Sequence, residues 1–159
     1  ISFDISDTTI GFGPLTTSNA RYATGDAAGS DTEATAHTLT ASSSAAGGYT
    51  ITVEGPTLTS AGGTIDAIGG TNTASSAGTE QFGIKATVAG ISYYDEVDAT
   101  YTGSGYGYDG TSSASTFATQ SQGDGFTSTY SVQYIANMAT GTETGAYSTD
   151  LNYIMTGNF

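Results

Sequence analysis

The sequence contains no cysteine and no tryptophan, and it has only two basic side chains, Arg21 and Lys85. Without cysteine, the chain can form neither a disulfide framework nor a thiolate metal site. The two bases stand against 15 acidic residues, which gives a formal net charge of -13 at pH 7. So few cations cannot neutralise phosphate groups, and this argues against binding to nucleic acid or to an anionic membrane.

Long apolar runs are also missing, and residues that favour helices are scarce. No stretch approaches the roughly 20 apolar residues that span a bilayer. The frequent residues are instead Gly, Ser, Thr and Ala, with 23 Gly and 11 Tyr among the 159 residues. Thr, Tyr, Val, Ile and Phe favour strands, whereas Gly, Ser, Asn and Asp favour turns. The composition therefore predicts one all-β domain that is large enough to hold a hydrophobic core.

Alternation of apolar and polar residues marks the expected strands. It begins at the first residue, in ISFDIS, and recurs in segments 34–41, 48–55, 81–90, 91–101, 126–138 and 145–159. Gly/Ser/Thr-rich loops are expected at 55–79 and 101–115, and the best candidate for a short helical turn lies at 113–120. Seven or eight short strands separated by turn signals predict an antiparallel β-sandwich, Ig-like or jelly-roll-like.

No arrangement of catalytic residues is recognisable. The only histidine, His37, lies in the middle of an expected strand, where a hydrogen-bonded structural role is favoured over a catalytic one. Neither a G-x-S-x-G elbow nor an H-E-x-x-H motif occurs. Lys85 lies between the apolar Ile84 and Ala86 and should point away from the core face of its strand. We therefore expect a protein that is not an enzyme.

Acidic residues gather in two expected loops, and two interpretations of them remain open. Calcium prefers carboxylate and carbonyl oxygens, so these loops are candidates for a calcium site, although no EF-hand pattern is present. The simpler interpretation is solvated loop charge, with no cofactor at all. The candidate ligands are Asp26, Asp31, Glu33, Asp95, Glu96 and Asp98.

Tyr106 and Tyr108 lie between glycines in GSGYGYDG. Exposed tyrosine rings can stack on sugars or face a protein partner, whereas partly buried ones close the end of a sandwich. These two tyrosines and the acidic loops define an alternative function, that of a monomeric surface adhesion or carbohydrate-binding sandwich, with calcium as an optional cofactor.

The closing segment GAYSTDLNYIMTGNF resembles the last strand of bacterial pilins and related secreted coat proteins. Gly145, Tyr147, Leu151, Tyr153 and Phe159 match that strand in kind. Chaperone–usher pilins usually place an aromatic one residue before the end and often carry a disulfide; this chain ends on Phe and lacks cysteine. GYTITV and the closing strand are also similar to secreted surface sandwiches of the WxL-like kind, without their tryptophan motif. The resemblance implies an exported cell-surface protein, and a start without Met is consistent with a removed signal peptide.

We divide the chain into a leading segment, residues 1–12, and a single sandwich domain, residues 13–159. The leading segment has two interpretations. It is either the first strand of its own sandwich or a donor strand that completes the next subunit by adding to an exposed sheet edge. Repeated head-to-tail donation makes a filament. We favour a secreted, pilus-like homopolymer built by donor-strand exchange. The residues expected at the polymer interface are Ile1, Phe3, Ile5, Ile10 and Phe12.

Overall fold

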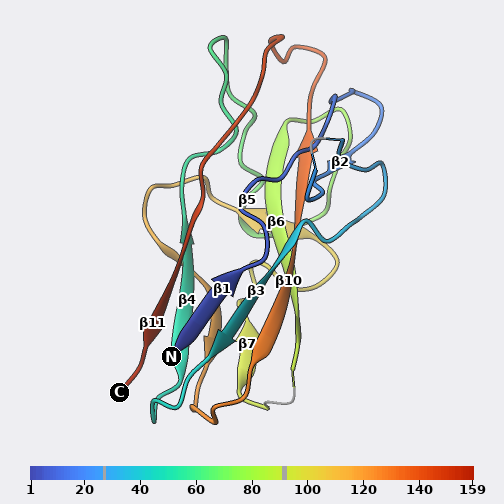
Figure 1. Cartoon of the computed structure of the whole chain (residues 1–159). Coiled ribbons are helices and arrows are strands. Elements are labelled where there is room, and N and C mark those ends of the chain that lie inside the picture. The colour runs from blue at the N-terminus through green and yellow to red at the C-terminus, as the bar shows by residue number, and fades with distance from the viewer. Residues whose placement is uncertain (27, 91–92) are drawn as a thin grey trace.

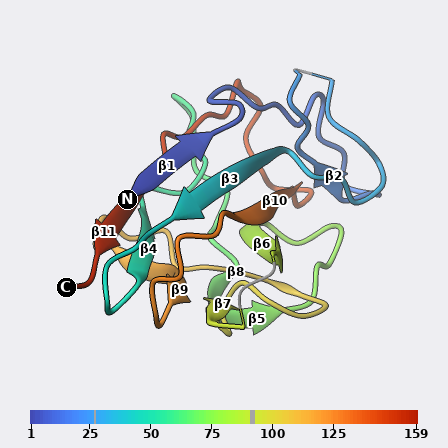
Figure 2. The same cartoon turned by 60° about the horizontal axis from the view of Figure 1, so that its bottom comes forward.

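The computed structural model describes residues 1–26, 28–90 and 93–159 (Figure 1). The described residues form eleven strands, which assemble into two antiparallel sheets that face each other (Figures 1 and 2). This arrangement confirms the expected all-β sandwich. Nowhere in these residues is there a helix with the length and apolarity needed to cross a bilayer.

The first sheet has seven strands, and β10 lies near its centre with β3 and β6 as neighbours. Strand β2 pairs with the far end of β10, beyond the point where β3 ends. The spatial order is β1 (Ser2–Ile5), β3 (His37–Ser42), β10 (Ser128–Asn137), β6 (Gln81–Ala89), β8 (Tyr106–Tyr108) and β5 (Gly69–Thr73), with β2 (Arg21–Tyr22) off this path.

The second sheet has four strands in the order β11 (Asn152–Gly157), β4 (Tyr49–Glu54), β9 (Ser115–Gln120) and β7 (Asp95–Val97). Strand β9 corrects the expectation of a helical turn at 113–120, because Phe117 and Ala118 are fully buried and the segment pairs with both β4 and β7. The loops expected at 55–79 and 101–115 are likewise not wholly irregular, since they contain β5 and β8.

The core between the sheets is built by the alternation that the sequence displays. In β3 and β4 every second residue is buried, including Leu39 and Ile51. Tyrosines supply much of the remaining volume and pair their hydroxyls inside the core. The hydroxyls of Tyr49 and Tyr130 lie 2.8 Å apart. Burial raises the pKa of Tyr130, so its phenol stays protonated and can take part in a hydrogen bond with the hydroxyl of Tyr49.

The two sheets come together along one side of the sandwich, where the edge strands β1 and β11 lie next to each other (Figure 2). A Cβ placed on Gly157 would lie 3.2 Å from Cδ1 of Ile1, so both chain ends meet at this place. Two aromatics that the alternation assigns to the core are exposed instead, Phe126 at 52% and Phe159 at 101%, because β10 begins after Phe126 and β11 ends before Phe159. Tyr93 is fully exposed, and Ile91 lies outside the described residues.

Candidate functional site

The segment expected to donate a strand pairs with β3 of its own chain. Phe3 lies opposite Ala41 and Ile5 opposite Leu39 in an antiparallel register. Phe3 and Ile5 are half-buried against the core, whereas Ile1 is 68% exposed. Strand β1 is the edge of its sheet, so β3 is its only neighbour there.

The end of the leading segment is fastened differently from its beginning. Gly11 and Thr24 exchange backbone hydrogen bonds of 3.0 Å, and Arg21 Nε donates to the carbonyl of Phe12 at 3.0 Å. Gly13, which has a positive φ of 65°, passes so close to Ala28 that a Cβ would lie 2.1 Å from its carbonyl oxygen. The expected donor segment, residues 1–12, therefore consists of an edge strand with Ser6 still bonded to β3, a linker over 7–10, and an anchored end at residues 11–12.

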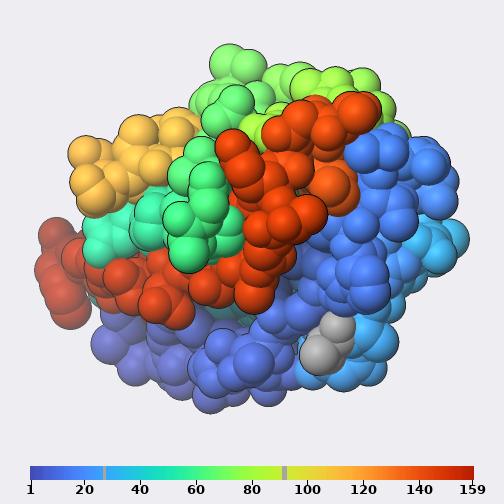
Figure 3. Space-filling view, turned by 90° about the horizontal axis from the view of Figure 1, so that it is seen from above, coloured from blue at the N-terminus to red at the C-terminus, as the bar shows by residue number. Residues whose placement is uncertain are grey.

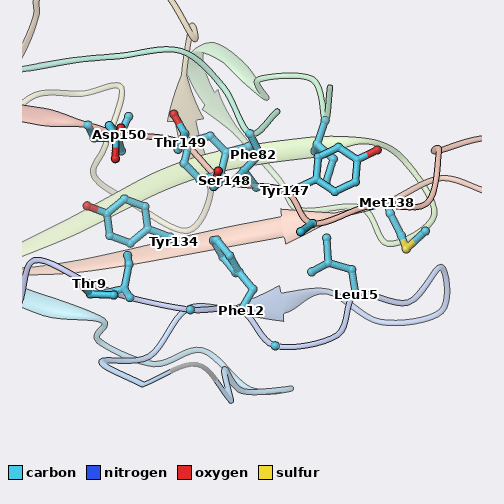
Figure 4. Close-up of a pocket in the computed structure, with 18 of the residues that line it drawn as sticks. Thr9, Phe12, Leu15, Phe82, Tyr134, Met138, Tyr147, Ser148, Thr149 and Asp150 are labelled. Atoms are coloured by element: carbon cyan, nitrogen blue, oxygen red, sulfur yellow. The ribbon is translucent and has the colours of Figure 1, made fainter. Parts of the chain in front are cut away.

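A groove of about 1160 Å³ opens where the two sheets diverge above β1 and β11. One wall is the leading segment, and the other is residues 142–153, in which Ser148 forms an isolated antiparallel bridge with Thr59 before the chain enters β11. Figure 3 shows this second wall, in orange-red, lying between the blue N-terminal segment and the green residues near 60. In Figure 4, Phe12 and Leu15 face Tyr147 across the groove, with Phe82 and Tyr134 behind them.

The groove combines an apolar floor with acidic side chains. Asp7, Glu143 and Asp150 line it, and none of the described residues that line it is Lys or Arg. Asp7 also accepts a hydrogen bond from the backbone of Thr9 at 2.9 Å. Both cations of the chain are engaged elsewhere, so the carboxylates of the groove have no protein cation beside them.

His37 lines the groove from β3 and is 94% buried, since only 6% of its surface is exposed. Its Nε2 lies 2.8 Å from the hydroxyl of Tyr134, which is 2.7 Å from the hydroxyl of Tyr153. The other ring nitrogen, Nδ1, has no hydrogen-bond partner among the described residues. Burial lowers the pKa of His37, so the ring is neutral at pH 7.

The two cations fasten one loop to the outer face of the first sheet. Arg21 pairs with Asp31 and donates to the carbonyl of Ala28 at 2.6 Å. Lys85 Nζ lies 2.6 Å from Glu33, which also accepts from the hydroxyl of Tyr106 at 2.6 Å. The direction expected for Lys85 was therefore right, but the loop covers it and leaves its side chain only 10% exposed.

The expected calcium ligands are not brought together. Within residues 1–26, 28–90 and 93–159, no three carboxylate or imidazole groups are placed so that they could hold a metal ion. Several candidates have other partners. Asp26 accepts from Thr24 and Ala28, Asp95 accepts from Gln120 and Ser128, and Asp98 accepts from the backbone of Thr100. Asp31 and Glu33 form the two ion pairs described above, and Glu96 is exposed.

Tyr106 and Tyr108 do not present their rings to a ligand. They are 2% and 1% exposed, and both hydroxyls bond within the protein, Tyr106 to Glu33 and Tyr108 to the carbonyl of Gly55 at 2.5 Å. The expectation of a stacking loop is therefore wrong in this structure, because β8 joins the first sheet, where Tyr108 packs into the core and Tyr106 is covered beside Lys85 and Glu33.

The fold and the groove define the protein as a two-sheet antiparallel sandwich with a groove between residues 5–15 and residues 142–153. Comparison with models of known families, with curated proteins and with solved structures finds no significant match. Reasoning from the sequence missed the groove, because its walls are about 130 residues apart along the chain. The one local signal is that Ile10, Phe12 and Leu15 continue apolar spacing beyond β1.

Proposed function

We propose that this chain is a structural subunit of an extracellular filament and that neighbouring subunits are joined by exchange of β1. The observation that carries this proposal is the position of β1, a four-residue edge strand with one neighbour in its sheet. Its contacts with β3 can be made equally well by the β1 of a second copy, because exchange of an identical element preserves every contact. An uncovered β3 edge would in turn accept such a strand.

The anchored end of the leading segment limits how far β1 can reach. Gly11 and Phe12 stay bound to residues 21–24, and Ser6 bonds to Thr38 of β3, so residues 1–6 would cross to the neighbour and residues 7–10 form the linker. Four extended residues span at most about 14 Å. The β3 strand of the next subunit must therefore lie within that distance of Gly11. Ile10 would lie in the linker and Phe12 would remain in its own subunit, which narrows the donor expected from the sequence to Ile1, Phe3 and Ile5.

An exposed apolar end supplies further contact area for assembly. Ile1 and Phe159 are largely exposed and close together, and Tyr93 and Phe126 are exposed on neighbouring loops. Backbone hydrogen bonds connect these loops, such as Gly123 N–H to Ala45 and Asn158 N–H to Gly48. Exposed apolar groups gathered at one end mark an interaction surface. Half-buried Phe3 and Ile5 contribute only about 1 kcal/mol each, so a stable junction needs this added area.

The proposal is tested by sedimentation velocity and electron microscopy of the purified chain over a range of concentrations. We expect long polymers, and we expect Phe3→Asp combined with Ile5→Asp to leave single subunits. The matched control, Ser2→Asp with Thr8→Asp, adds the same charge at exposed positions and should still polymerise. A wild-type chain that stays monomeric at every concentration, or that stops at a closed dimer, contradicts the filament.

A further inference from the structure

We propose that the groove between the leading segment and residues 142–153 binds an extended, basic segment of a partner protein. This segment would alternate apolar side chains, directed at the floor, with Lys or Arg directed at the acidic rim. The site belongs to a subunit whose β1 pairs with its own β3, because exchange would turn Asp7 and Ile10 into part of the linker, whereas Phe12, Leu15 and residues 142–153 would keep their places. It would attach a second kind of protein to the subunit.

The apolar half of the recognition is supplied by both walls and the floor. Phe12 and Leu15 come from one wall, Leu151 from the other, and Phe82 from the floor (Figure 4). These side chains are only partly buried at the walls, so a partner that covers them removes more apolar surface from water. Grooves of this kind, with an apolar floor and a few polar groups, are the usual sites for a ligand.

The polar half of the recognition rests on charge complementarity. The carboxylates of Asp7, Glu143 and Asp150 line the groove without a protein cation, and the chain carries a net charge of -13. A second copy brings the same negative charge, and both of its cations are held in ion pairs. Electrostatics therefore favours a basic partner over a second copy of this chain.

A buried polar atom lies behind the groove wall. Nδ1 of His37 has no hydrogen-bond partner among the described residues, and it is itself shielded from solvent. A ligand in the groove therefore meets other atoms of the wall, and recognition rests on the acidic rim and the apolar side chains.

The backbone of the wall favours an extended peptide as the occupant. Gly11 exchanges backbone hydrogen bonds with Thr24, so its own polar groups are paired within the chain. The N–H and C=O of Ile10, which lines the groove, make no hydrogen bond with other described residues. A strand laid along this wall can pair with them, as in peptide recognition by strand addition.

The test uses calorimetric titration with two blocked octapeptides, one alternating Val and Lys and the other alternating Val and Glu. We expect the Val/Lys peptide to bind in 50 mM salt and to bind more weakly in 500 mM salt, because screening reduces charge attraction. The Val/Glu peptide should not bind. Octalysine serves as the probe for attraction to the negative surface in general.

Two variants with equal charge change locate the binding. Asp7→Asn, Glu143→Gln and Asp150→Asn remove the acids of the groove, whereas Asp4→Asn, Asp66→Asn and Glu96→Gln remove three exposed acids elsewhere. We expect the affinity for the Val/Lys peptide to fall at least tenfold in the first variant and less than twofold in the second. Thermal unfolding of each variant shows that the fold is retained.

Three results would overturn the inference. Equal loss in both triple variants, or equal binding of octalysine, shows attraction to the whole surface only. Equal binding of the Val/Glu peptide shows that the acids do not select the ligand. Loss of self-association in the groove variant, without any peptide binding, makes a second copy the occupant. Polymers of the wild-type chain can persist in all three cases, so this failure is distinct from failure of the filament.

Discussion

Strands β6 and β1 belong to the same sheet, yet they are held in opposite ways. The first six residues of β6 are buried, on both faces of the strand, whereas β1 alternates exposed and half-buried residues. Strand β6 has β10 and β8 as neighbours, and the loop that carries Glu33 covers its outer face. Among the described strands, β1 pairs with β3 alone. Strand β6 therefore belongs to the part of the sheet that determines the fold. Strand β1 is an edge strand, and the same strand of a second copy could take its place.

The largest expected effect lies at the centre of the sheet. Ile84→Ala in β6 removes a fully buried side chain and leaves a cavity, so the free energy of unfolding should fall by about 2–5 kcal/mol. Ile5→Ala in β1, the matched variant, should cost about 1 kcal/mol because Ile5 is half-buried. Urea denaturation of the two variants measures both values. Equal losses would remove the distinction between centre and edge.

A smaller effect is expected where the loop covers β6. Glu33→Gln leaves the buried Lys85 ammonium without its carboxylate, and the cost should be about 1–2 kcal/mol. This is less than for a fully buried pair, because the Glu33 side chain is 41% exposed. Asp31→Asn breaks the other ion pair, in which Asp31 is 70% exposed, and should cost under about 1 kcal/mol. A larger loss for Asp31→Asn would show that the two pairs have been ranked wrongly.

The same Lys85 contact predicts an acid dependence. Burial raises the pKa of Glu33, but hydrogen bonds from Lys85 and Tyr106 outweigh it, so the pKa lies below its usual 4.5. The ion pair therefore stabilises the fold above about pH 4.5, and this contribution is lost as the pH falls through the lowered pKa. Glu33→Gln should lose less stability than the wild type when the pH is lowered from 5 to 3. An unchanged pH profile would contradict this role of Glu33.

The smallest effect is expected beside the edge, at His37 in β3. Burial lowers its pKa below the usual 6.5, so just below that pH the unfolded chain binds a proton that the folded chain does not. The nearby Asp7 carboxylate opposes this shift without reversing it. Stability should decrease by less than about 2 kcal/mol from pH 7 to 5, and His37→Phe should reduce this decrease. Urea denaturation of the wild type and of His37→Phe at the two pH values measures this decrease. An identical decrease in the two proteins would exclude His37 as the cause.

The sequence predicts those strands whose side chains alternate strictly, and it fails where other forces decide. Residues 34–41 cover β3 except for its last residue, and residues 126–138 contain β10, because one face of each strand is buried throughout. In contrast, β8 consists of Tyr-Gly-Tyr between glycines, which locally indicates a turn, and it becomes a strand only by pairing with β5 and β6. The burial of Lys85 likewise depends on Glu33, which is 52 residues away along the chain.

The candidate sites show the same limit more strongly. Alternation correctly indicates that Phe3 and Ile5 direct their side chains at an apolar surface, but it does not say whose surface this is. The groove depends on two segments that are distant along the chain, and its unpaired His37 nitrogen appears only in three dimensions. The clustering of carboxylates in the sequence does not produce a calcium site among the described residues. In the structure these carboxylates bond to loop amides, to hydroxyls and to the two cations.

The most direct measurement of β1 exchange uses paired cysteines in this cysteine-free chain. Asp4 and Thr40 lie opposite each other in β1 and β3, at a separation that a disulfide can bridge. Thr38 and Ser131, opposite each other in β3 and β10, form a control pair that must stay within one chain. After oxidation, non-reducing gels of the Asp4→Cys/Thr40→Cys protein should show a ladder of linked subunits, whereas the control remains a single band. A disulfide formed only within single chains at every concentration would contradict the account.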